Sequence, residues 1–377
     1  MTNIERAAMR IEEVRVYSKG VPVVAGTYRM SLSSVKALDS TIVEIVTNEE
    51  QSGWGETCPI GPLYQPHHML GARAALAEIA PKLIGLELTS IGALWKRMEE
   101  SLNGHGYAKA ALDIAAFDLL GKKFGVPVST LLGGALTDRV MSYYSLVVSN
   151  PDESAKLAKD KVKHGYKRLQ IKVGGRPIEQ DIETVRKVWE TVGYKARLAV
   201  DGNRGLTIAG TMALDRQCAD IPLILEQPCN TMAEIITLRG RLVHPVYLDE
   251  NTEDLNLVLT AIGAGIADGF GFKVTRLGGL SKIAVARDMC ALRSLPHTCD
   301  DAWGGDIIAA ACVHIGSTVE PSRCEGVWIA QDYLEGHYDS KSPVETREGY
   351  IRVPNGPGLG INPEAGAFGK PIAVYGR

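Results

Sequence analysis

The sequence predicts an α/β protein in which a parallel barrel of alternating strands and helices follows a smaller α+β domain. Between residues 139 and 344, short apolar runs alternate with amphipathic segments, and this alternation is typical of a parallel α/β barrel. Five of the apolar runs, spread between Arg168 and Lys273, end in a charged residue. The chain of 377 residues is also longer than one ordinary domain, which favours two domains.

The amino-terminal part carries strand patterns first and helix patterns afterwards. Residues 11–16 and 41–46 alternate between apolar and polar side chains, as strands do. Helical periodicity then extends from His68 to about Phe124. Its strongest run, residues 107–121, is apolar on more than one side and predicts a buried helix. Strands followed by helices predict an α+β domain.

The predicted domain boundaries follow from these patterns. Residues 1–8 lack a signal pattern and are expected to be a disordered extension. We expect the α+β domain over residues 9–137 and the barrel over residues 138–345. The tail, residues 346–377, contains the proline- and glycine-rich run 354–360, which cannot form a core alone and is expected to return to the first domain. Amphipathic helices of the barrel are expected at residues 152–163, 178–191, 232–239 and 280–291.

Composition excludes several classes of partner. A formal net charge of -3 gives no reason to expect nucleic acid or a membrane surface. No apolar run reaches the 18 residues that a transmembrane helix needs. The seven cysteines contain no CxxC pair, which favours reduced thiols in a cytoplasmic protein over a disulfide framework or a zinc site.

The charged residues that end the five runs recur at nearly constant spacing. They are Lys172, Asp201, Glu226, Asp249 and Lys273. The steps of 29, 25, 23 and 24 residues are about the length of one strand–helix unit in a barrel of ~250 residues. A charge at the end of a buried strand is costly unless it has a partner or a task. If the strands are parallel neighbours, all five charges meet at one mouth of the barrel.

The three carboxylates among these residues predict a cation site. Asp201, Glu226 and Asp249 offer hard oxygen ligands, which suit Mg²⁺ or Mn²⁺ rather than zinc. Each alone could cap the following helix, but three at consecutive spacing, flanked by two lysines, favour the metal. Lys172 and Lys273 can face each other across the site. To act as bases they must lose a proton near neutral pH, and we expect Mg²⁺, the other lysine and partial burial to lower the pKa of each.

This set of residues resembles the enolase superfamily, and within it the mandelate racemase/muconate lactonizing enzyme group, over essentially the whole chain. The resemblance implies a (β/α)7β TIM-like barrel, a capping domain built from both chain ends, and abstraction of a proton α to a carboxylate. A lysine or histidine base beside Mg²⁺ is already known for this superfamily. The implied roles are bases at Lys172 and Lys273, metal ligands at Asp201, Glu226 and Asp249, and supporting polar residues at Asn203 and Glu250.

One position departs from the family pattern. The family often has Lys-x-Lys at the end of the second barrel strand, and here Gln170 occupies the first of these positions. The change removes one positive charge beside Lys172, so the way in which the pKa of Lys172 is lowered is left open. Gln170 is also a candidate substrate contact.

Three further stretches resemble the proline-derivative branch of the family, which includes 4-hydroxyproline betaine 2-epimerases and cis-3-hydroxy-L-proline dehydratases. They are residues 55–59, 297–306 and 325–328. A cationic ring nitrogen would be attracted by carboxylates or an aromatic face, and a tyrosine in the proline-rich loop could close over it as a lid. Core packing of the tryptophans, a loop turn at the aspartates and a surface tyrosine are the alternatives. The candidate contacts are Asp300, Asp301, Trp303, Trp328 and Tyr64.

We therefore expect a Mg²⁺-dependent racemase or epimerase that moves the α-proton of a proline-type amino acid or betaine by a two-lysine 1,1-proton transfer through an enediolate. Dehydration of cis-3-hydroxy-L-proline is the first alternative. Dipeptide epimerisation, cycloisomerisation and a non-catalytic barrel scaffold are further ones. The expected partners are a small carboxylate substrate and other copies of the chain, in a homo-oligomer whose size the sequence does not give.

Overall fold

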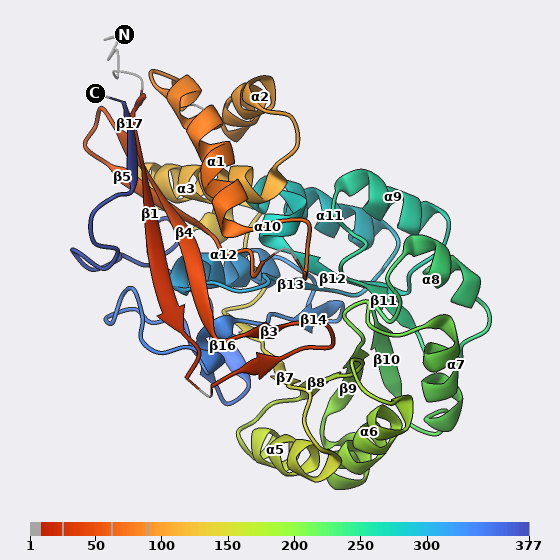
Figure 1. Ribbon diagram of the computed structural model, residues 1–377. Helices are drawn as coiled ribbons and strands as arrows, with labels where there is room; N and C mark the ends of the chain where they lie inside the picture. The colour runs from red at the N-terminus through yellow and green to blue at the C-terminus, as the bar shows by residue number, and fades with distance from the viewer. Residues whose placement is uncertain (1–8, 25, 62, 89, 377) are drawn as a thin grey trace.

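A parallel barrel forms the centre of the molecule. The structure, a computed structural model, describes residues 9–24, 26–61, 63–88 and 90–376, so the predicted extension at residues 1–8 lies outside the described residues. Within them, eight parallel strands follow one another in chain order from β7 to β14 and curl into a barrel (Figure 1). A parallel bridge between Ser142 and Val327 brings the two ends of this sheet together.

The barrel strands confirm the predicted apolar runs. All eight are short and buried for most of their length, as parallel strands covered by helices are. Asp249 was predicted to end a strand, but β11 stops at Leu248, and Asp249 and Glu250 both lie in the turn that follows. The strands are β7 (Tyr144–Leu146), β8 (Arg168–Lys172), β9 (Arg197–Asp201), β10 (Leu223–Glu226), β11 (Val246–Leu248), β12 (Gly269–Lys273), β13 (His297–Asp300) and β14 (Cys324–Gly326).

Helices surround the barrel, and the four predicted from the sequence agree with the structure to within one residue at each end. Local capping accounts for the starts of two of these helices. Asn150 accepts a hydrogen bond from the Glu153 amide at the start of α5, and Thr231 and Glu234 form a capping box in α8. The helices are α5 (Pro151–Lys163), α6 (Ile178–Val192), α7 (Ile208–Gln217), α8 (Met232–Leu238), α9 (Leu255–Gly263), α10 (Val274–Leu277), α11 (Leu280–Leu292) and α12 (Asp306–Ser317), with 3₁₀ turns η2 (Gly193–Lys195) and η3 (Ala330–Tyr333).

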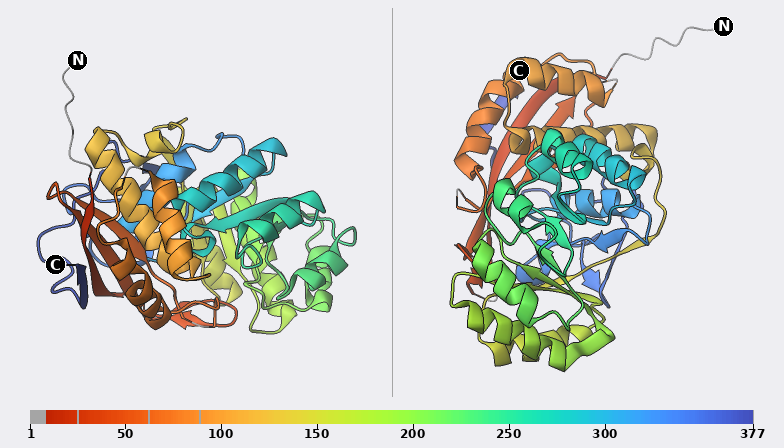
Figure 2. Two further views of the ribbon diagram at one scale, coloured as in Figure 1. Left: turned by 90° about the horizontal axis from the view of Figure 1, so that it is seen from above. Right: turned by 90° about the vertical axis from the view of Figure 1, so that its right-hand side faces the viewer.

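The second part of the molecule is an antiparallel sheet with helices on one side, which lies against the barrel (Figures 1 and 2). Its strand order is β17-β1-β4-β5, and β17 pairs antiparallel with β1, so the last strand of the chain lies beside the first. The strands are β1 (Ile11–Pro22), β4 (Ala37–Thr47), β5 (Ser52–Thr57) and β17 (Ala373–Gly376); the helices are α1 (Met69–Ile79), η1 (Ala80–Leu83), α2 (Ile91–Ser101), α3 (Gly106–Phe124) and α4 (Val128–Leu131).

Short strands complete the structure. The hairpin of β2 (Tyr28–Arg29) and β3 (Ser34–Val35) belongs to the loop between β1 and β4. In the tail, β15 (Thr346–Arg347) pairs with β16 (Tyr350–Arg352), and β16 pairs with β6 (Arg139–Met141), which leads into the barrel. The tail therefore contacts the barrel before it reaches the antiparallel sheet at β17.

The helix predicted to be buried, α3, lies between the antiparallel sheet and the barrel (Figure 1). Every residue from Tyr107 to Gly121 is buried. The close approach depends on small residues, since a Cβ at Gly55 of β5 would come within 1.8 Å of the Ala111 carbonyl oxygen. On the barrel side, Asp113 accepts hydrogen bonds from the Ser281 amide and hydroxyl at the start of α11.

Two absences agree with the composition. In the part of the chain that the structure describes, the seven cysteines are all free thiols. None of the helices in the described ranges combines the length and the apolar character that crossing a bilayer requires.

The contact between α3 and the barrel predicts a strong requirement for glycine at position 279. Gly279 has a φ of +115°, and an added Cβ would lie 2.5 Å from Oδ2 of Asp113. We expect Gly279→Ala to lower the free energy of unfolding by about 2–4 kcal/mol in urea titration, because strain and overpacking add. Gly263→Ala is the control, since its Cβ meets nothing within 4 Å; a loss equal in both variants would refute this account.

Candidate active site

Five charged side chains converge at one mouth of the barrel, as their spacing predicted. Asp201, Glu226 and Asp249 are buried, and one ligand oxygen from each lies within 4.8 Å of the others. They come from three neighbouring strands or the turn after them, between β8 and β12. Because β8 and β12 are four strands apart in a barrel of eight, Lys172 and Lys273 reach the carboxylates from opposite sides of the mouth.

Both lysines contact the carboxylates directly. Nζ of Lys172 lies 2.5 Å from Oδ2 of Asp201, and Nζ of Lys273 lies 3.4 Å from Oδ1 of Asp249 and 3.5 Å from Oδ2 of Asp300. Burial alone would lower the pKa of each lysine, but the carboxylates outweigh burial and raise both pKa values. In the protein alone, burial therefore does not lower these pKa values below the ordinary lysine value, and the expected lowering in the presence of Mg²⁺ stays a prediction.

The carboxylate set fits a hard divalent cation. Burial and the nearby Asp201 raise the pKa of Glu226, so keeping this carboxylate ionised costs free energy that a bound divalent cation would offset. Asn203 supports Asp201, since its amide and side chain donate to the two carboxylate oxygens at 2.8 and 3.1 Å. The same side chain donates to Glu250 at 3.1 Å. Oxygen ligands in this arrangement suit Mg²⁺ or Mn²⁺, with Asn203 and Glu250 behind the ligands rather than among them.

Arg276 is a member of the site that the sequence did not reveal. It is buried, and its guanidinium donates to Oδ1 and to the backbone carbonyl of Asp249. Although burial opposes ionisation, Arg276 and Lys273 lower the pKa of Asp249. Arg276 also donates to the hydroxyl of Tyr64 at 3.2 Å. In the sequence, only its position three residues after Lys273 could have indicated that Arg276 belongs to the site. The short helix α10 directs its side chain toward Asp249.

Gln170 belongs to a chain of hydrogen bonds that starts in the capping loop. The hydroxyl of Tyr28 donates to Ser145 at 2.8 Å, and Ser145 donates to the Gln170 carbonyl oxygen at 2.8 Å. The Gln170 amide then donates to Glu226 at 3.0 Å. Gln170 also lines the site cavity. Gln170 is thus held from both ends.

Arg168 places a positive charge deeper in the barrel than position 170, where the family often has a lysine and this chain has Gln170. It lies two residues before Gln170 on β8, so both side chains point to the same face of the strand. Arg168 is fully buried, and its guanidinium lies 3.5 Å from Glu226 and 3.7 Å from Glu325. The positive charge that is absent at position 170 is therefore supplied nearby by Arg168. This charge lies against the carboxylate of Glu226 rather than beside Lys172.

Aromatic side chains form one wall of the site. The ring centroids of Trp303 and Trp328 lie 5.3 Å apart, and Tyr28 packs edge-on against Trp303 at 5.0 Å. Both tryptophans line the same cavity as the two lysines. Both tryptophans are buried and also line the cavity. Core packing and substrate contact, the two alternatives stated from the sequence, are therefore compatible.

The predicted aspartates serve different purposes. Asp301 lines the cavity, but its carboxylate accepts hydrogen bonds from Thr275 and from the Ala302 amide, and burial raises its pKa to about 6. Asp300 accepts from the Tyr143 hydroxyl at 2.8 Å and from the Trp328 amide at 2.6 Å. Asp300 therefore ties Lys273 to the aromatic wall.

The capping domain closes the site. Tyr28, Met30, Ile60 and Tyr64 complete a cavity of only about 30 Å³. The Tyr64 hydroxyl lies 3.3 Å from Oδ2 of Asp249. Arg204, which follows Asn203, donates to the carbonyl of Tyr64 at 2.6 Å and fastens this loop to the barrel. The capping loops therefore enclose this small cavity together with the barrel mouth.

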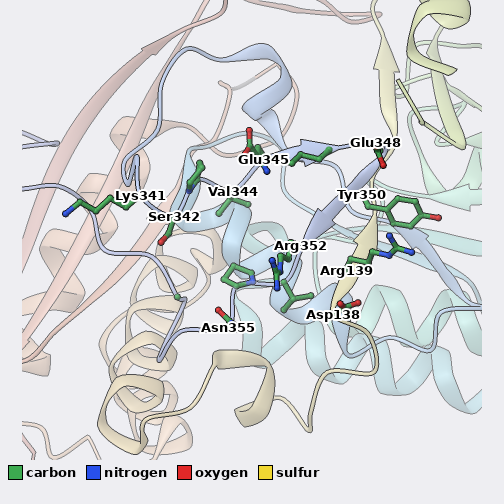
Figure 3. Close-up of a pocket in the computed structure, with 15 residues that line it drawn as sticks. Asp138, Arg139, Lys341, Ser342, Val344, Glu345, Glu348, Tyr350, Arg352 and Asn355 are labelled. Carbon is green, nitrogen blue, oxygen red and sulfur yellow. Dashed lines mark hydrogen bonds and ion pairs between the residues drawn. The ribbon is translucent and has the colours of Figure 1, made fainter. Parts of the chain in front are cut away.

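A wider hollow of 620 Å³ lies away from this mouth, beside β6, β15 and β16 (Figure 3). Charged side chains of both signs line it, and Arg139 lies over the ring of Tyr350 at 4.8 Å. It contains none of the lysines or carboxylates described above. Although this hollow is larger than the cavity at the barrel mouth, it lacks the residues described above, and the cavity at the mouth remains the candidate active site.

Comparison with known families agrees with both parts of the fold. Residues 11–133 match the family described as mandelate racemase/muconate lactonizing enzyme, N-terminal domain. Residues 153–367 match the family described as enolase C-terminal domain-like.

Individual proteins with these domains are similar over nearly their whole length. The chain is 36% identical to the cis-3-hydroxy-L-proline dehydratase of Roseibium aggregatum, over 97% of this chain and 100% of the relative. It is 26% identical to the L-Ala-D/L-Glu epimerase of Clostridium acetobutylicum, over 94% of this chain and 99% of that protein. A solved enolase-superfamily structure from Roseovarius nubinhibens, complexed with magnesium, gives a TM-score of 0.92 at 30% identity, covering 98% of this chain and 100% of that one.

The carboxylate geometry predicts that Glu226→Gln abolishes divalent-metal binding without unfolding the protein. One charged ligand is lost while the side-chain volume is kept, so we expect the affinity for Mn²⁺ to fall more than about 100-fold by calorimetry. Mg²⁺ should raise the melting temperature of the wild type and not that of the variant. The exposed Glu253→Gln is the matched control. Unchanged Mn²⁺ affinity in Glu226→Gln would contradict the assignment.

Proposed function

Because the chain belongs to the mandelate racemase/muconate lactonizing enzyme group of the enolase superfamily, we propose that it is a Mg²⁺-dependent epimerase of a cationic, proline-type carboxylate. The observation that carries the proposal is the placement of Lys172 and Lys273 on strands four apart, on opposite sides of the carboxylate cluster. A 1,1-proton transfer needs one group on each face of the α-carbon. The two lysines supply that pair.

In the proposed reaction, one lysine in its neutral form takes the α-proton and the opposite lysine, in its charged form, returns a proton to the other face. Asp201, Glu226 and Asp249 would hold the metal. A cation held there would supply positive charge beside the substrate carboxylate, where negative charge develops as the α-proton leaves. It would also engage the carboxylates that now raise the pKa of both lysines, which brings a neutral lysine within reach at working pH.

The substrate class rests on the walls of the cavity. Trp303 and Trp328 border the same small space as the lysines. A cation against an indole face gains roughly 0.5–2 kcal/mol, which favours a ring nitrogen that is protonated or methylated. The small cavity that the metal ligands and the aromatic wall share suits a compact ring with its carboxylate attached next to the nitrogen.

Dehydration of cis-3-hydroxy-L-proline is the second candidate, favoured by the 36% identity to an enzyme of that name. In that substrate the 3-hydroxyl and the α-proton lie on opposite faces of the ring. One lysine would take the α-proton, the Cα–Cβ double bond would form as the Cβ–O bond breaks, and the opposite lysine would protonate the departing hydroxide to water. The same pair of lysines therefore suits an anti elimination.

The two-lysine mechanism predicts that each lysine can be tested alone. Lys172→Ala and Lys273→Ala should each stop epimerisation in both directions, since both lysines act in every turnover. Each surviving lysine should still exchange the α-proton of the isomer that faces it. In D₂O, proton NMR should therefore show deuterium entering one epimer in one variant and the other epimer in the second. Lys96→Ala, on the exposed face of α2, should behave as the wild type.

Other outcomes separate the alternatives. Loss of all exchange in one lysine variant, with the other nearly unimpaired, would refute the two-base mechanism. Release of water from a 3-hydroxylated substrate without any epimer would replace epimerisation by dehydration.

A further inference from the structure

Glu56 is a buried carboxylate of the capping domain that receives hydrogen bonds from both domains. It lies near the end of β5 and is fully buried. Its Oε1 accepts from the Ser40 hydroxyl at 2.6 Å, the Gly305 amide at 2.8 Å and the Tyr338 hydroxyl at 3.0 Å. Its Oε2 accepts from the Ile308 amide at 3.1 Å. A carboxylate is suited to this place because it accepts at both oxygens.

The two amide donors belong to the first turn of α12 and the residue before it. An acceptor with negative charge at the amino end of a helix satisfies amides that the helix leaves unpaired. The backbone is closely packed there: Gly304 has a φ of +141°, and a Cβ at Gly305 would lie 2.2 Å from the Tyr338 ring. Trp303 directly precedes these glycines, so the path of the chain from Glu56 to the indole is short and leaves little freedom.

We infer that Glu56 is a positioning residue, which holds Trp303 in the aromatic wall and so sets the affinity of the site for the cationic part of the substrate. Glu56 does not line the cavity and acts through Gly304 and Gly305. This inference rests on the proposed function only where it names a cationic ring; the control of Trp303 by Glu56 is testable without it.

Asp118 provides a matched control within the same domain. It is also fully buried, and it accepts from the Trp54 amide at 2.9 Å and from the Leu359 amide at 2.8 Å. Like Glu56, it ties separate segments of the chain together through backbone amides. It differs from Glu56 because one of its amide donors, Leu359, belongs to the tail, and neither donor adjoins a residue of the site. A general loss of packing would affect both variants, whereas control of Trp303 is expected of Glu56 alone.

The test compares Glu56→Gln, Tyr338→Phe, Asp118→Asn and Trp303→Phe in the metal-loaded protein. The amide nitrogen that Glu56→Gln introduces cannot accept from Ile308, whereas Tyr338→Phe removes one donor and leaves the charge in place. We expect KM for the best cationic ring substrate to rise about three- to ten-fold in Glu56→Gln, with kcat nearly unchanged, as for lost binding that is equal in ground and transition states. A smaller rise in the same direction is expected in Tyr338→Phe, and none in Asp118→Asn. Mn²⁺ affinity should not change.

A double-variant cycle shows whether the effect passes through Trp303. In the Trp303→Phe background, Glu56→Gln should raise KM by less than about 1.5-fold, because coupled residues are not additive. Near-ultraviolet circular dichroism gives a readout independent of activity. The band that Trp303→Phe removes should weaken in Glu56→Gln and persist in Asp118→Asn.

The outcomes distinguish the inference from the proposed function. If the wild type acts on no cationic ring substrate, the proposed function fails, and the dichroism comparison still decides the role of Glu56. An unchanged Trp303 band in Glu56→Gln, or equal loss in Asp118→Asn, would overturn the inference. So would a full KM effect of Glu56→Gln in the Trp303→Phe background.

Discussion

The arrangement of the barrel mouth is governed by the need to compensate three carboxylates buried within 4.8 Å of one another. Like charges this close cannot all stay ionised in a poorly hydrated site unless cations surround them. Lys172 and Arg276 contact two of the carboxylates directly, and Arg168 approaches the third from below. Every one of these side chains lies in the barrel interior or its mouth. A divalent cation is the natural addition to this set.

The capping domain completes the site that the barrel forms. Tyr28 and Tyr64 reach into the mouth from separate loops, and both are tied to barrel side chains by hydrogen bonds. Two buried carboxylates, Asp113 and Glu56, accept backbone amides of the barrel at the start of α11 and α12. The two domains are therefore joined through polar contacts to the chain segments that follow Lys273 and Trp303. Domain packing and site geometry depend on each other.

The sequence predicted the barrel because parallel strands bring their carboxyl ends to one mouth, so regular spacing along the chain becomes proximity in space. This holds for Lys172 and Lys273 and for the three carboxylates. Spacing along the chain could not predict Arg276 or Tyr28. The position of Arg276 depends on the short helix α10, and that of Tyr28 depends on how a capping loop packs on the barrel. Nor does spacing predict the direct contacts of both lysines with carboxylates, which depend on side-chain conformation.

The central claim is that a carboxylate-held Mg²⁺ and two opposed lysines act on the α-proton of a cationic ring. Proton NMR in D₂O tests it most directly, with wild-type protein and a panel of proline, hydroxyprolines, their N-dimethylated betaines and the neutral isostere tetrahydrofuran-2-carboxylate. The account predicts α-deuteration of at least one cationic ring acid, only with Mg²⁺ present and far faster than that of the neutral isostere. Exchange that survives complete removal of metal by EDTA, or that proceeds equally on the neutral isostere, would contradict it.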